Sequence, residues 1–133
     1  MKKSTSRAIK YASIIICIAL AISVILIYKD YKRNHSDALY YLGITAKKEG
    51  DCLKGIKLLS MSIEANPKNY GPYMTLGDCF EKLGRFDLAV EEYQLAYKLI
   101  ENSKDKSESF DRKSIKKKLK KLQKTQKLKQ APK

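Results

Sequence analysis

The sequence predicts an all-α fold, with an N-terminal transmembrane helix, two helix-turn-helix repeats and a C-terminal basic capping helix. Three observations lead to this prediction. Residues 11–28 form an uncharged apolar run, residues 36–69 and 70–103 share a 34-residue pattern, and residues 104–129 carry apolar side chains at helical spacing among lysines. A fixed period of this length is typical of stacked helix pairs, in which each pair buries its apolar face against the next.

The positive charge of the chain is concentrated at its two ends. Residues 1–35 carry seven Lys or Arg and one Asp, which gives +6, whereas residues 36–101 carry eight basic and ten acidic side chains, which gives −2. Residues 102–133 carry thirteen basic and three acidic side chains, or +10, and complete the formal charge of +14. The repeats are therefore close to neutral, and this distribution disfavours a nucleic-acid binder that uses its whole surface.

The first element runs from Tyr11 to Tyr28 without a charge. As a helix, this segment is ~27 Å long, close to the ~30 Å hydrocarbon core of a bilayer. Tyr11 and Tyr28 stand at its ends, where aromatic rings favour the interface, and Lys10 and Lys29 can extend their ammonium groups to the headgroups. We therefore expect a single-pass membrane protein, with residues 29–35 as a juxtamembrane linker.

A cleaved signal peptide is the alternative. The N-terminal tail, residues 1–10, is basic, and Ala19-Leu20-Ala21 has the small-x-small form of a cleavage site. Cleavage there would leave a mature chain that begins at Ile22 with an apolar end and nothing for it to pack against. We therefore expect an uncleaved anchor. The tail has four Lys or Arg and the other flank has three, so the positive-inside rule places the repeats on the non-cytoplasmic side.

Each repeat reads as two helices joined by a turn. In the second repeat, Asn69 can cap a helix whose first turn holds Pro72, where proline costs no hydrogen bond. Gly84 ends that helix and Asp87 opens the next, along which apolar residues recur at helical spacing. The first repeat has the same kinds of signal: Ser36 or Asp37 starts its first helix, Gly50-Asp51 forms the turn, and Pro67 ends its second helix.

The two units resemble the tetratricopeptide repeat (TPR) family over residues 36–101. The family pattern has a large residue, Leu-Gly, a bulky residue, a Gly turn, an aromatic, a small residue, a bulky residue, Ala and Pro. The second unit supplies Tyr73, Leu76, Gly77, Phe80, Gly84, Phe86, Ala89, Tyr93 and Ala96. The first supplies Leu39, Leu42, Gly43, Ala46, Gly50, Gly55, Leu59, Ser62 and Pro67. The departures are Cys52 for the aromatic after the turn, Gly55 and Ser62 for alanines, and Glu101 for the closing proline.

The resemblance implies which residues pack the helices together and which face a ligand. The repeat-packing residues would be Leu42, Gly43, Gly50, Gly55, Leu76, Gly77, Gly84, Ala89, Tyr93 and Ala96. The first helix of each pair would line a concave peptide groove with Asp37, Tyr40, Tyr41, Ile44, Lys47, Lys48, Met74, Thr75, Asp78, Glu81 and Lys82. The Lys, Arg and Asn clamp by which some members hold acidic chaperone tails is mostly replaced here, by Tyr40, Ile44, Gly71 and Thr75. A mixed groove of this kind fits a short peptide or helix.

The C-terminal segment is predicted to cover the last repeat. Two repeats are fewer than the ~3 usually needed for a stable array. Ile115, Leu119 and Leu122 follow a 4-then-3 spacing and form one stripe on a Lys-rich cap helix at residues 104–129, followed by a disordered tail at 130–133. Its lysines form either a solvated face or a contact with anionic lipid. Nucleic acid is disfavoured because the segment holds only one aromatic residue and one arginine.

No set of residues points to catalysis, a cofactor or a metal. Cys17, Cys52 and Cys79 are scattered without CxxC spacing, and His35, the single histidine, lies in no catalytic or metal-binding motif. We expect Cys52 and Cys79 to be small core residues. The sequence thus predicts a non-enzymatic, membrane-anchored TPR protein that binds a protein or peptide partner in a scaffold or assembly role. The alternative is a small structural subunit of a larger membrane complex, whose repeats pack permanently against a partner chain.

Overall fold

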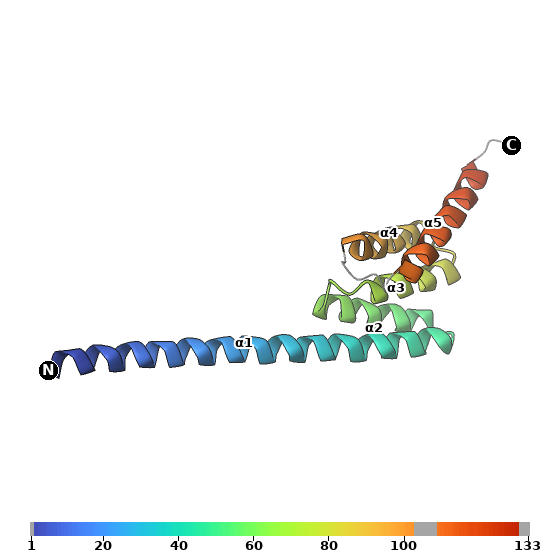
Figure 1. The fold of residues 1–133 in the computed structure, drawn as a ribbon. Coiled ribbons are helices and arrows are strands. Elements are labelled where there is room, and N and C mark those ends of the chain that lie inside the picture. The colour runs from blue at the N-terminus through green and yellow to red at the C-terminus, as the bar shows by residue number, and fades with distance from the viewer. Residues whose placement is uncertain (1, 103–108, 131–133) are drawn as a thin grey trace. The chain divides into compact units, whose positions relative to one another are not determined.

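The computed structural model describes the backbone of residues 2–102 and 109–130, and the side chains of residues 11–102 and 111–125. Five helices follow one another in this part of the chain: α1 (Lys2–Lys48), α2 (Cys52–Ala65), α3 (Tyr70–Lys82), α4 (Phe86–Asn102) and α5 (Ser109–Gln130) (Figure 1). The predicted all-α fold is confirmed. The chain divides into two compact units, one up to Asn34 and one from His35 onward.

The first unit is the part of α1 that contains the apolar run. Its large apolar side chains between Tyr11 and Tyr28 are all exposed, as a surface that faces lipid would be. The helix is long and apolar enough to cross a membrane. The coarse prediction of one candidate membrane-spanning helix is therefore confirmed.

The boundaries predicted around this helix differ from the structure. Residues 29–35, predicted as a linker, are helical, and the helix predicted to begin at Ser36 or Asp37 instead continues from Lys2 to Lys48. The linker sequence contains no Gly or Pro that would end a helix. Residue 103 of the second repeat, the start of the predicted cap helix at 104–108 and residues 131–133 lie outside the described part of the chain.

The turns of the second unit follow local signals in the sequence. Gly50 and Gly84 have φ of 90° and 72°, a left-handed conformation that glycine adopts without a steric cost. Asp51 caps α2 by accepting a hydrogen bond from the Lys54 amide at 2.9 Å. Asn69 caps α3 by accepting from the Gly71 amide at 3.0 Å. α4 begins at Phe86, one residue before the predicted Asp87.

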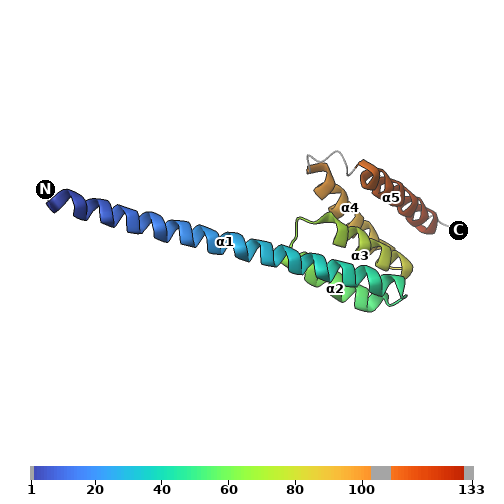
Figure 2. The same ribbon diagram turned by 60° about the horizontal axis from the view of Figure 1, so that its bottom comes forward.

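The helices of the second unit pack in chain order around two apolar clusters. Figures 1 and 2 show α3 between α2 and α4, with α5 beside α4. The first cluster joins α2 to α3 and contains Cys52, Leu59, Leu76 and Cys79, so the prediction that both cysteines are core residues is confirmed. The second joins α4 to α5 and contains Ala89, Tyr93, Ala96, Ile100, Ile115 and Leu122. The apolar stripe of α5 therefore covers α4.

Candidate functional site

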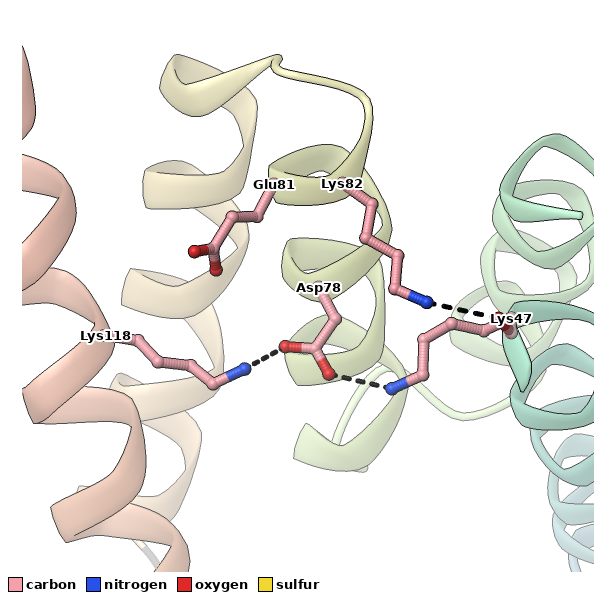
Figure 3. A pocket seen from close by; sticks show the side chains of 5 residues that line it. All are labelled: Lys47, Asp78, Glu81, Lys82 and Lys118. Atoms are coloured by element: carbon pink, nitrogen blue, oxygen red, sulfur yellow. Dashed lines mark hydrogen bonds and ion pairs between the residues drawn. The ribbon is translucent and has the colours of Figure 1, made fainter. Parts of the chain in front are cut away.

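A charged hollow of about 520 Å³ opens between α1, α3 and α5 in the second unit. Five side chains line it, and Figure 3 shows them converging from three helices: Lys47, Asp78, Glu81, Lys82 and Lys118. α3 supplies the two acids because Asp78 and Glu81 are three residues apart and share one helix face. Lys82 comes from the end of the same helix, whereas Lys47 of α1 and Lys118 of α5 come from the helices on either side. We call this site the groove.

Asp78 is the centre of the groove. Its Oδ2 accepts a hydrogen bond from Lys47 Nζ at 2.8 Å, and its Oδ1 accepts from Lys118 Nζ and from the Tyr93 hydroxyl, the latter at 2.7 Å. Burial alone raises the pKa of Asp78, but the hydrogen bonds from Lys118, Lys47 and Tyr93 outweigh it and hold the pKa below its ordinary value. One ionised carboxylate thus connects α3 to α1, α4 and α5.

Tyr93 and Glu81 extend this network. The Tyr93 hydroxyl also lies 3.1 Å from Glu81 Oε2, and Lys118 Nζ lies 3.2 Å from that hydroxyl and 5.1 Å from the ring centroid. Burial raises the pKa of Tyr93, and its bond to Asp78 raises it further, so the phenol remains a neutral donor. Lys121 donates to Glu81 Oε1 at 3.0 Å. Each acid of the groove is therefore bonded to both Tyr93 and a lysine of α5.

The groove carries more positive than negative charge. Two carboxylates, of Asp78 and Glu81, face three lysines of the lining, Lys47, Lys82 and Lys118. A fourth ammonium group comes from Lys121, which pairs with Glu81 from beside the lining. Lys82 makes a long hydrogen bond of 3.4 Å to the Lys47 carbonyl, and its side chain is exposed. The two surplus charges can attract an anionic group of a partner. Among the side chains that the structure describes, in residues 11–102 and 111–125, no three His, Cys, Asp or Glu are grouped so as to hold a metal ion.

The structure brings together four of the residues predicted to line the groove: Lys47, Asp78, Glu81 and Lys82. Asp37, Ile44 and Lys48 do not line it. Thr75 is 2% exposed and its hydroxyl donates to the Gly71 carbonyl, so it cannot meet a ligand. Met74 packs against the apolar cluster of α4 and α5, and Tyr40 packs against that of α2 and α3. Tyr41 is 67% exposed, but it does not line the groove either.

The repeat-packing residues are mostly at helix contacts. A Cβ on Gly43 would lie 2.7 Å from Leu59 Cγ, and one on Gly77 would lie 2.6 Å from Tyr93 Cε1. Gly55, Leu76, Ala89, Tyr93 and Ala96 are buried, and Gly50 and Gly84 form the turns. Leu42 contradicts the prediction, since it is 56% exposed. Its counterpart Leu76 packs on the helix of the preceding repeat, and the described part of the chain supplies no such helix for Leu42.

Three members of the network, Tyr93, Lys118 and Lys121, were not predicted as site residues, and Lys121, like Lys118, belongs to the predicted cap helix. Lys118 was assigned to the lysine-rich cap, and Tyr93 was assigned to packing alone. The sequence did contain a signal for Lys118, because it lies three residues after Ile115 and four before Leu122, on the face of the apolar stripe. No comparable signal identifies the Tyr93 hydroxyl as a partner of Asp78, since that contact depends on how α3 and α4 pack.

The resemblance to tetratricopeptide repeats rests on the sequence pattern of residues 36–101. No protein-family model matches the chain, and no curated protein matches it either. What the groove binds is therefore inferred from the side chains that line it.

Proposed function

We propose that the chain is a membrane-anchored TPR-like protein that binds a peptide or a segment of another protein in the groove, in a scaffold or assembly role. The observation that carries this proposal is the groove itself, where three helices present charged side chains around an open hollow. Repeat modules of stacked helix pairs use such concave surfaces for binding. The surplus of lysines favours a partner segment that carries carboxylates.

Lys82 provides the sharpest test of the groove. Its side chain is exposed and forms none of the ion pairs of Asp78, so Lys82→Glu reverses a charge in the groove without breaking that network. We expect the variant to lose a partner that the wild-type chain captures from solubilised membranes. Lys57→Glu, on an exposed position of α2, is the matched control and should keep that partner. A partner retained equally by both variants would exclude the groove as its binding site.

The structural-subunit alternative makes a different prediction. In that case the repeats would depend on a partner chain for order, and a fragment from His35 onward would be molten or aggregated. The burial of Ile115 and Leu122 of α5 against α4 favours a self-sufficient unit instead. Circular dichroism and urea unfolding of the fragment distinguish the two. A cooperative transition supports the groove-binding protein, and its absence supports the subunit.

The lysines of α5 favour a second contact, with anionic lipid headgroups. The apolar stripe of α5 faces α4. Six lysines of α5 are exposed: Lys113, Lys116, Lys117, Lys120, Lys121 and Lys124. No acidic residue follows Asp111, and of these six lysines Lys121 pairs with Glu81 of α3, so most of the positive charge on this face has no acidic neighbour along α5. The fragment should bind vesicles that contain phosphatidylserine at low salt and lose them at high salt. Equal binding to neutral vesicles would contradict this contact.

A further inference from the structure

The two repeats do not use equivalent surfaces in the same way. A shift of 34 residues matches four positions of α1 to four of α3: Ala38 to Pro72, Tyr41 to Thr75, Leu42 to Leu76, and Thr45 to Cys79. All four positions of α3 are buried, and Leu76 and Cys79 belong to the cluster with Leu59 of α2. The four positions of α1 are exposed. A surface that is an internal contact in the second repeat is therefore open in the first.

This open surface has the pattern of a helix–helix contact. Ala38, Leu42 and Thr45 follow a 4-then-3 spacing, which is the spacing of the seam of a coiled coil. Tyr41 lies beside them, and its ring packs against Tyr40 at a centroid distance of 5.9 Å. None of the four residues is charged, and interface cores are poor in charge. We call these four residues the α1 face.

We propose that the α1 face binds the α1 face of a second copy of this chain, in a parallel two-fold dimer. The same helix carries the apolar run, so copies in one bilayer enter it in the same direction. Confinement to the membrane raises their effective concentration, and a two-fold axis along the membrane normal brings the same surface of both copies together. An uncharged face is compatible with itself, whereas a charged one would repel its copy. The proposal relies on the anchor of the proposed function but not on its groove.

Cysteine cross-linking of the full-length chain in lipid vesicles tests this dimer. In a Cys17→Ser background, single cysteines are introduced at Ala38, Leu42 or Thr45, while the native Cys52 and Cys79 remain buried. We expect oxidation to give a cross-linked dimer at these positions several-fold faster than at Lys54→Cys or Lys57→Cys, which are exposed on α2. Equal rates at all positions would mean random collision, and a monomer at every position would mean no dimer. Either result overturns the proposal.

A charge on the α1 face should break the dimer and leave the fold intact. Leu42 and Tyr41 are exposed, so Leu42→Glu removes no core contact and Tyr41→Glu removes only the ring contact with Tyr40. Each should abolish the cross-link through Thr45→Cys, while Lys57→Glu should not, and circular dichroism should be unchanged in all three. A dimer that survives both substitutions overturns the assigned surface. A second result would also overturn the proposal. If maleimide cannot label the α1 face in native membranes but the purified chain is monomeric, another protein covers this face.

The experiment separates this proposal from the function proposed above. If alkaline carbonate extracts the chain from membranes, the apolar run is not an anchor, and both the proposed function and the parallel dimer are contradicted. A chain that remains in the membrane as a monomer contradicts the dimer alone. Loss of partner binding in Lys82→Glu concerns the groove, which shares no residue with the α1 face.

Discussion

Asp78 is the residue at which side chains from three other helices meet. Its carboxylate accepts hydrogen bonds from Lys47 of α1, Tyr93 of α4 and Lys118 of α5, and its side chain is 21% exposed. A half-buried carboxylate with three donors is stable only while each donor is in place. The residue therefore serves both the shape of the groove and the docking of α5.

Removal of this charge should destabilise the second unit. In Asp78→Asn, the ammonium groups of Lys47 and Lys118 lose their counter-charge at partly buried positions. We expect a loss of about 1–3 kcal/mol in the free energy of unfolding. Urea unfolding of the fragment from His35 onward measures it. The control is Glu64→Gln, an exposed carboxylate on α2, which should change stability by less than about 0.5 kcal/mol.

The same carboxylate predicts an acid-sensitive fold. The pKa of Asp78 is lowered in the folded state from an ordinary value of 3.8, so the folded state holds fewer protons than the unfolded chain. Its contribution is fully present above that ordinary value and is lost as pH falls through the lowered one. The gap in stability between wild type and Asp78→Asn should therefore narrow below about pH 4. A gap that does not depend on pH would mean that Asp78 contributes no charge interaction.

Residue-level features divide into those that sequence could predict and those that it could not. Asn69 at a helix cap and Gly84 in a turn act on their immediate neighbours, so their roles were visible in the sequence. The Asp78–Tyr93 bond joins residues on separate helices, and no local pattern records it. The exposure of Leu42 was missed for a related reason, because the family pattern assigns a position without saying whether a neighbouring helix is present.

At the scale of elements, the approach of α3 and α4 depends on Gly77. A Cβ there would lie 2.6 Å from the Tyr93 ring, which is fully buried and held through its hydroxyl. Gly77→Ala should therefore push the helices apart and cost about 1–3 kcal/mol of unfolding free energy. Gly84→Ala is the comparison, because a Cβ there would meet no atom within 4 Å and the only cost would be the backbone strain of a φ of 72°. If both variants lost the same unfolding free energy and Gly77→Ala kept the Tyr93 contacts, a steric clash at Gly77 would not be the cause.

The apolar stripe of α5 should contribute strongly to the stability of the second unit, whereas the lysines on its exposed face should contribute little. Ile115 and Leu122 are 0% and 2% exposed against α4, so replacing either by Ala leaves a cavity. We expect each substitution to cost about 2–5 kcal/mol in urea unfolding. Lys116→Ala and Lys117→Ala, on the exposed face, should be nearly neutral. If all four variants were equally stable, α5 would not be a cap.

The elements themselves were largely predictable, but the start of the first repeat was not. Helical spacing and turn residues indicated α2, α3 and α4 within a few residues of their observed bounds. The first helix was expected to begin at Ser36 or Asp37, because the repeat period begins there. A repeat boundary need not coincide with a helix boundary. Residues 29–35 contain nothing that stops a helix, so α1 continues through them.

At the scale of the whole molecule, the chain combines a candidate membrane span with a unit that carries its own apolar core. Both were predictable because each leaves a signal over a long stretch of sequence. The span is eighteen residues without charge, and the repeats share a 34-residue period. The groove was predicted only in part. Its α1 and α3 residues followed from the repeat pattern, whereas Lys118 came from a helix outside the repeats.

Membrane topology gives the last prediction. By the positive-inside rule, the four positive residues before the apolar run, against three after it, predict that the second unit lies on the non-cytoplasmic side. The native Cys52 and Cys79 are buried, and burial raises the pKa of Cys79 to about 12, so labelling requires an exposed position instead. In a Cys17→Ser background, an impermeant maleimide should label Lys57→Cys in intact cells and label Ser4→Cys only after permeabilisation. The reverse pattern would place the groove in the cytoplasm, and a labelled chain that lacks its first 21 residues would show that the run is a cleaved signal peptide.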